Sequence, residues 1–138
     1  MSANGLRTID DRFWRATVLF SFLFAGACNS DDGDKIDAAA AKRGAVLAKD
    51  CVACHSLTSK TNEVGPYLVG IVGRDIASAR GFKYSDALLA LDGNWNPERL
   101  AAFIHDPTSM TPGTMMAYNG ISKDEARDIV EHLRSLAR

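Results

Sequence analysis

The chain has 138 residues, of which 46% are hydrophobic and 24% are charged, and its formal net charge at pH 7 is −1. This length and composition are typical of one globular domain. The near-neutral charge provides no strongly basic surface, which argues against nucleic acid as a partner.

The first 28 residues have the pattern of an export leader. Three arginines precede residues 16–27, an uncharged and mostly apolar run. This run is shorter than the roughly 20 residues that a membrane-spanning helix needs, and it ends in Ala25-Gly26-Ala27, which resembles a cleavage site of small residues. We therefore expect export to the periplasm. An uncleaved anchor or a wrongly assigned start codon is the alternative.

Cys28 directly follows this cleavage site. The surrounding segment FAGAC resembles the box of bacterial lipoproteins, in which the cysteine is acylated, although Ala25 stands where the box prefers leucine. Acylation also accounts for the odd number of cysteines, because the other two form a motif of their own. We expect Cys28 to anchor the protein to a membrane. A leftover thiol in the leader is the alternative.

The rest of the chain has the pattern of helices joined by long loops. Residues 29–36 are mostly polar and acidic and predict a flexible tether, and residues 37–138 form the domain. Capping residues and apolar periodicity predict helices over about 36–50, 85–91 and 97–105, and a last helix that opens with Ser122 and Glu125 at capping-box spacing. No strand pattern is evident. The expected fold class is all-α, with about four to five helices.

Residues 51–55 read CVACH, which is the C-x-x-C-H attachment signal for c-type haem. Two thiols at this spacing can add to the two vinyl groups of one porphyrin, and the next residue, His55, then lies under the iron. A zinc site would need a second cysteine pair, and a thioredoxin-like redox pair would need a βαβ context. We expect one covalently bound haem c. It would also fill the interior of a small, loop-rich domain.

Three of the four methionines fall within residues 107–118, around the turn formed by Pro112 and Gly113. A haem that is ligated by histidine and methionine needs a thioether opposite the histidine, and a loop pinned by a proline can hold one there. Adjacent side chains in an extended segment point to opposite sides. We therefore expect only one of Met115 and Met116 to face the haem.

Taken in order, these motifs resemble the class I cytochromes c, the family of the mitochondrial protein and its soluble bacterial relatives. The resemblance covers about residues 42–136. It rests on CVACH at 51–55, GPYLVGIVGR at 65–74, GFKYSDAL at 81–88, NWNPERLAAFIHDP at 94–107, PGTMM at 112–116 and the amphipathic last helix. It implies the cytochrome c fold, in which long loops wrap around one covalently bound haem.

The resemblance also implies roles for single residues. Met116 lies four residues after the proline of the family pattern and is the implied iron ligand opposite His55, with Met115 pointing outward. The carbonyl of Pro66 is the implied acceptor for the ring N–H of His55. The implied cofactor-binding residues are Cys51, Cys54, His55, Pro66, Arg74, Tyr84, Trp95 and Met116. Among these, Tyr84 and Trp95 are the implied hydrogen-bond donors to a haem propionate, and Arg74 is the implied cation nearby.

One further position matches the family pattern, and four positions depart from it. Gly44 matches the glycine at which the first helix crosses the last. Phe103 stands where many members have a tyrosine that reaches the methionine sulfur, and His132 stands where the last helix usually presents an aromatic residue. Thr108 and Ser109 replace lysines that surround the haem edge in mitochondrial members. We therefore do not expect a redox partner that recognises lysines at this edge.

The expected function is that of a one-electron carrier, not an enzyme, which moves electrons between redox partner proteins in the bacterial cell envelope. Two alternatives remain. The domain could be a haem subunit of a membrane-associated oxidoreductase, or a haem protein whose methionine leaves so that a small molecule can bind.

Overall fold

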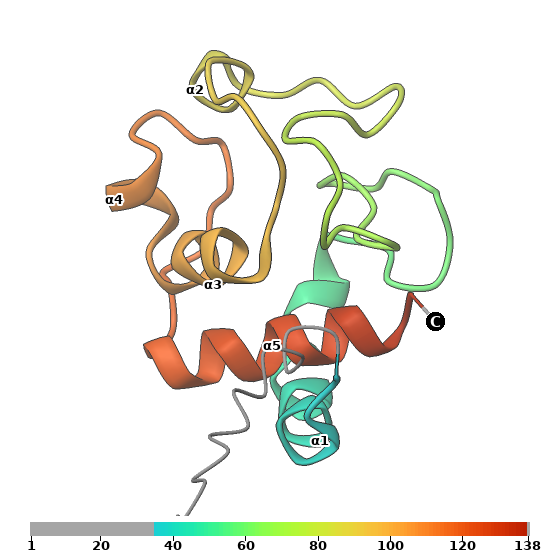
Figure 1. The fold of residues 1–138 in the computed structure, drawn as a ribbon. Helices are drawn as coiled ribbons and strands as arrows, with labels where there is room; N and C mark the ends of the chain where they lie inside the picture. The colour runs from blue at the N-terminus through green and yellow to red at the C-terminus, as the bar shows by residue number, and fades with distance from the viewer. Residues whose placement is uncertain (1–34, 138) are drawn as a thin grey trace, which may run out of the picture. The chain divides into compact units, whose positions relative to one another are not determined.

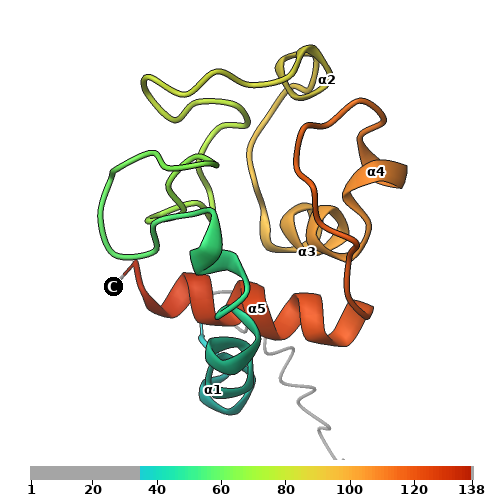
Figure 2. The same ribbon diagram turned by 180° about the vertical axis from the view of Figure 1, so that it is seen from behind.

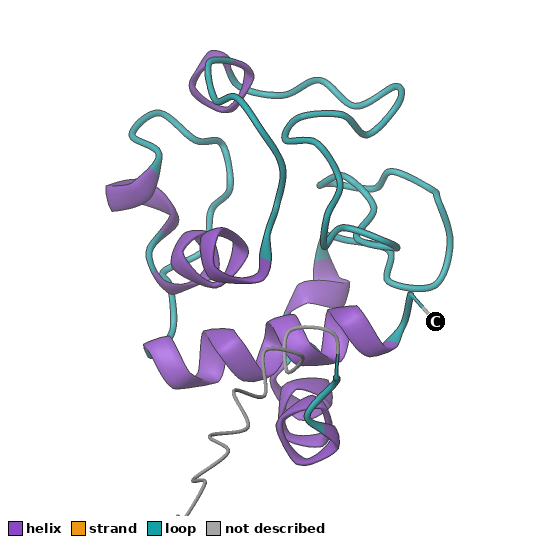
Figure 3. Ribbon diagram, in the orientation of Figure 1, coloured by secondary structure: helices purple, strands orange, loops and turns teal. Residues whose placement is uncertain are grey.

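The computed structural model describes residues 35–137. Its elements are α1 (Ala38–Leu47), the 3-10 turn η1 (Cys51–Ala53), α2 (Asp86–Leu89), α3 (Pro97–His105), α4 (Pro107–Met110) and α5 (Lys123–Ser135) (Figure 1). No strand occurs among these residues, and long loops connect the helices (Figure 3). The expected all-α class is confirmed.

The leader and Cys28 lie outside the described residues, as does the tether up to residue 34. Within residues 35–137, none of the helices combines the length and the apolar character that crossing a membrane requires.

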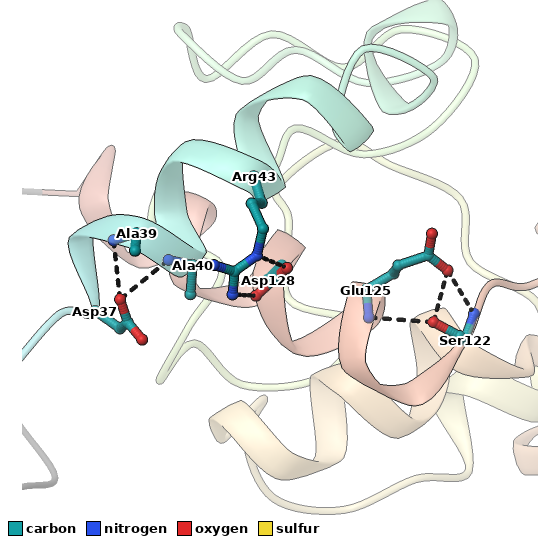
Figure 4. A network of polar contacts seen from close by, with 7 residues as sticks. All are labelled: Asp37, Ala39, Ala40, Arg43, Ser122, Glu125 and Asp128. Carbon is teal, nitrogen blue, oxygen red and sulfur yellow. Dashed lines mark hydrogen bonds and ion pairs between the residues drawn. The ribbon is translucent and has the colours of Figure 1, made fainter.

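Side-chain caps determine where the helices begin. Asp37 accepts the backbone N–H groups of Ala39 and Ala40 at the start of α1, and Ser122 and Glu125 form the expected capping box of α5 (Figure 4). Ser85 and Asn96 cap α2 and α3 in the same way. These caps satisfy backbone donors that have no partner within the helix.

The helix bounds agree with the expectation for α3, whereas α1 and α2 are shorter than expected. Two elements were not expected, namely η1 and α4. Pro107 occupies the first position of α4, where its missing N–H is harmless. Asp106 caps α4 by accepting the Ser109 N–H at 2.9 Å.

The crossing of α1 over α5 depends on Gly44. A Cβ atom at this position would overlap the carbonyl of Asp128, so only glycine lets the two backbones come this close. Beside the contact, Arg43 donates two hydrogen bonds to Asp128, at 2.6 and 2.7 Å (Figure 4). The expected role of Gly44 at a helix crossing agrees with this geometry.

The inward face of α5 forms the base of the core. The amphipathic pattern of the last helix agrees with its burial. Four apolar residues are buried, namely Ala126, Ile129, Val130 and Leu133, whereas Leu136 at the C-cap is 40% exposed. In both views α5 lies between α1 and the remainder of the domain (Figures 1 and 2). The loops that follow η1 stand on one side, and α3, α4 and the loop after α4 stand on the other.

Candidate functional site

A cavity of about 500 Å³ lies above α5 and is lined by residues from both sides of the domain. Its walls are mostly apolar, and its volume falls within the range of small-molecule sites. Seven of the eight cofactor-binding residues expected from the sequence line it, namely Cys51, Cys54, His55, Pro66, Tyr84, Trp95 and Met116. The eighth, Arg74, is not among the lining residues.

His55 follows η1 and its cap Cys54, and it is held by two hydrogen bonds. Its backbone N–H donates to the Cys51 carbonyl at 2.9 Å, which closes the turn over the C-x-x-C-H motif. Its ring Nδ1 lies 2.6 Å from the Pro66 carbonyl oxygen. Because a carbonyl can only accept, Nδ1 carries the proton and Nε2 keeps its lone pair for a metal. A Cβ at Gly65 would overlap the imidazole ring, so this glycine makes room for it.

The two thiols of the motif differ in their exposure. Cys51 is half-buried and Cys54 is exposed, and both line the cavity. Burial raises the pKa of the Cys51 thiol, and the carboxylate of Asp50 acts in the same direction. Before attachment Cys51 is therefore a protonated thiol rather than a thiolate.

The segment that contains the two methionines has alternating exposure. Thr114, Met116 and Tyr118 are half-buried, whereas Met115 and Ala117 are exposed. Such alternation is typical of an extended chain with one face against the core. Met115 is 63% exposed, and Met116 packs against the core cluster.

Tyr84 and Trp95 lie where one wall of the cavity meets the core. The Tyr84 hydroxyl accepts the Ala79 N–H at 3.1 Å, which leaves its own proton available for a further acceptor. Burial raises the pKa of Tyr84, although the Ala79 N–H and the positive charge of Arg74 act against this shift. Trp95 is buried and packs against Phe103, with ring centroids 5.1 Å apart.

Arg74 lies behind this wall. Its guanidinium donates to the carbonyls of Tyr67 and Val69, at 2.8 and 3.3 Å, and stacks on the Tyr67 ring. Its Nε is buried and has no hydrogen-bond partner among the described residues. A buried charged donor without a partner is costly, so this atom is suited to an anionic acceptor that the protein itself does not provide.

Tyr118 is a cavity residue that the sequence did not single out. It lines the cavity, and burial raises its pKa, with the carboxylate of Asp50 acting in the same direction. Its position two residues after Met116 is a signal that could have identified it, because alternate residues of an extended segment share a face.

Together these residues fit a haem. The apolar walls suit a porphyrin ring. The His55 imidazole is held through Nδ1 with Nε2 free to bind a metal, and Gly65 leaves the space that the imidazole ring occupies. The Tyr84 hydroxyl, which lines the cavity, is a suitable donor for a carboxylate.

The comparison with known protein families gives the same answer. The profile of the family described as "Cytochrome c" matches residues 41–137. This chain belongs to the cytochrome c family. The family binds haem c covalently, and the C-x-x-C-H motif for this attachment is present, so the expectation of one covalent haem c is confirmed.

Individual relatives are bacterial cytochromes. The chain is 44% identical over 97 residues to a cytochrome c homolog of Rickettsia bellii, and the match covers 69% of this chain and 56% of that protein. It is 42% identical over 91 residues to the cytochrome c-type cyt cy of Rhodobacter capsulatus, with 65% of this chain and 45% of the relative covered. The chain thus spans about half the length of these relatives.

A solved structure has the same fold. The cytochrome cH from Methylobacterium extorquens superposes with a TM-score of 0.64 at 34% sequence identity, covering 69% of this chain and 97% of that protein. The expected cytochrome c fold is confirmed.

Proposed function

We propose that this cytochrome is a one-electron carrier whose single haem is attached through Cys51 and Cys54 and ligated by His55 and Met116. The observation that carries the proposal is that all four side chains line one apolar cavity. A bound haem supplies an iron that cycles between Fe(III) and Fe(II). The residues of the chain determine which of these two states is favoured and which partner proteins can approach the haem.

Two features of the cavity would favour the reduced state of a haem iron held there. The soft sulfur of Met116 would stabilise Fe(II). Apolar walls, including Leu100, Phe103 and Ile104, keep water away and disfavour the additional charge of Fe(III). Two features would act in the opposite direction. Phe103 has no hydroxyl that could withdraw electron density from the sulfur by a hydrogen bond, and the bond from His55 Nδ1 to Pro66 raises the basicity of the ligating nitrogen.

The surface at the cavity mouth indicates the kind of redox partner. The exposed lining residues are Cys54, Val64, Met115 and Ala117, with one carboxylate at Asp50 and one ammonium group at Lys83. Thr108 and Ser109, which replace the lysines of mitochondrial members, are exposed and uncharged. We propose that the partner presents a small, mostly apolar face. Electron transfer to it should then depend only weakly on salt concentration.

The cellular place of the protein is proposed from the sequence pattern of its first 28 residues. In this proposal the leader directs export, Cys28 is acylated, and the carrier works in the cell envelope between partner proteins. The intact mass of the mature protein tests the anchor. An unmodified Cys28, or a chain that keeps its leader, would show that the anchor is absent.

A redox titration followed by optical spectroscopy tests the carrier function. We expect a single reversible one-electron step and colour that stays on the chain during acid–acetone extraction. A pigment that passes into the solvent would refute covalent attachment. If carbon monoxide shifts the Soret band of the native reduced protein, a ligand-binding haem is favoured instead. Co-purification with a membrane enzyme would favour the subunit alternative.

A further inference from the structure

The loop that carries Met116 begins and ends at two residues that contact each other. Residues 106–120 leave the end of α3, pass through α4 and return to the start of α5 (Figure 1). His105 is the last residue of α3, and Ile121 directly precedes Ser122, the cap of α5. His105 and Ile121 therefore stand at the two ends of this ligand loop.

Two hydrogen bonds join the ends of the ligand loop. The Ile121 N–H donates to the His105 carbonyl at 3.2 Å. The His105 side chain returns the contact, with Nδ1 lying 2.6 Å from the Ile121 carbonyl oxygen. Because this carbonyl can only accept, Nδ1 is the donor. Gly120 lies so close to the His105 carbonyl that a Cβ atom there would overlap it, so the two backbones are in direct contact.

The half of the ligand loop that contains Met116 packs against the core through Met116 and Tyr118 but has few other hydrogen bonds. Within residues 35–137, the segment 115–120 takes part in one hydrogen bond, from the Met116 N–H to Thr114 Oγ1 at 3.3 Å. The first half is better held, since Asp106 caps α4 and the Thr114 N–H donates to the Thr111 carbonyl at 3.0 Å. The position of Met116 thus depends strongly on how firmly the loop is closed at Ile121.

We propose that His105 is a positioning residue for the Met116 sulfur. Its bond to Ile121 holds the ligand loop closed and thereby keeps the methionine at the iron. This role rests on the proposed ligation by Met116. Loss of one such bond should raise the population of the open loop roughly five-fold, which corresponds to about 1 kcal/mol at about 1.36 kcal/mol per factor of ten.

Three variants of the full-length holo-protein test the role of His105. His105→Leu removes the donor, whereas His105→Asn places an amide N–H close to the position of Nδ1. Arg43→Gln is the control, because it breaks an exposed ion pair between α1 and α5 and leaves the ligand loop unchanged. The probe is free imidazole, which replaces a methionine sulfur on Fe(III) when the loop opens.

We expect His105→Leu to bind imidazole roughly five-fold more tightly than the wild type, and its Ile121 amide to exchange with solvent faster by a similar factor. His105→Asn should return both values toward those of the wild type. Arg43→Gln should match the wild type in both, although its free energy of unfolding is slightly reduced.

The outcomes separate the two claims. A wild-type protein without the far-red charge-transfer band of Fe(III)–sulfur ligation would refute the proposed ligand and the inference with it. If the band is present but the Leu and Asn variants bind imidazole equally, only the role of His105 is wrong. If His105→Leu fails to fold, His105→Gln replaces it, because the amide of glutamine extends past the position of Nδ1 and does not reproduce the bond to Ile121. If His105→Gln then binds imidazole as the wild type does, the role of His105 is wrong.

Discussion

The α1–α5 crossing of this cytochrome is stabilised by close packing and an ion pair, whereas the second half of its ligand loop has few hydrogen bonds. At the crossing, glycine allows direct backbone contact, Arg43 pairs with Asp128, and four apolar residues of α5 are buried. The ligand loop has caps and turns in its first half, but segment 115–120 takes part in a single hydrogen bond among the described residues.

This difference separates folding stability from iron ligation. Regions with few hydrogen bonds and little burial open locally at a lower free energy than the whole domain. The crossing should therefore govern global unfolding, while the ligand loop should govern which ligand occupies the iron. Substitutions in one region should leave the property of the other nearly unchanged.

The largest expected effect is at the crossing. Gly44→Ala introduces a Cβ that overlaps the Asp128 carbonyl, so α1 and α5 must move apart. We expect the free energy of unfolding to fall by about 3 kcal/mol or more. Alanine is a better helix former than glycine by about 1 kcal/mol, so propensity alone predicts the opposite sign. Guanidinium chloride unfolding of the holo-protein decides between the two, and an unchanged or increased stability would contradict the packing account.

The sequence predicts the longer helices better than the short elements. Capping residues placed α3 correctly, and the capping box located the start of α5. Both signals are local, since they involve residues three or four positions apart. Short elements such as η1 and α4 have too few residues to show a hydrophobic period, and they were missed.

The site was predicted where it follows a contiguous motif. CVACH and the segment around Met116 identify the cavity residues that they contain, whereas the bond from His105 to Ile121 joins residues sixteen positions apart and has no local pattern. The His105 ring is half-buried and donates to the far end of the loop. Arg74 was expected beside the haem, but its guanidinium also supports the backbone behind the cavity wall.

A smaller effect is expected inside the ligand loop. Thr111 is 3% exposed, and its hydroxyl has no hydrogen-bond partner among the described residues. Thr111→Val keeps the shape of the side chain and removes the unsatisfied group, so it should stabilise the closed loop by about 1 kcal/mol. Imidazole binding to Fe(III) should weaken accordingly. Thr111→Ser, which keeps the hydroxyl, is the control, and tighter imidazole binding by the valine variant would be inconsistent with this account.

The smallest expected effect is a pH dependence that comes from α5. Burial lowers the pKa of His132 on α5 from its ordinary value of 6.5. At pH values between the lowered pKa and 6.5, the unfolded chain binds more protons at His132 than the folded protein does. The contribution of His132 to the free energy of unfolding is therefore complete above pH 6.5 and is lost as the pH falls through that window. His132→Phe should flatten the dependence of the unfolding free energy on pH there. An identical slope in both proteins would show that His132 does not contribute.

The identity of the methionine ligand tests the account most directly. The measurement is the far-red Fe(III)–sulfur band, recorded for the wild type, Met116→Ala and Met115→Ala, together with the reduction potential. We predict that Met116→Ala loses the band, lowers the potential and lets carbon monoxide bind the reduced iron, because Met116 is half-buried against the core. Met115→Ala should resemble the wild type, because its side chain is 63% exposed. The reverse pattern, with the band lost only in Met115→Ala, would contradict the proposed site.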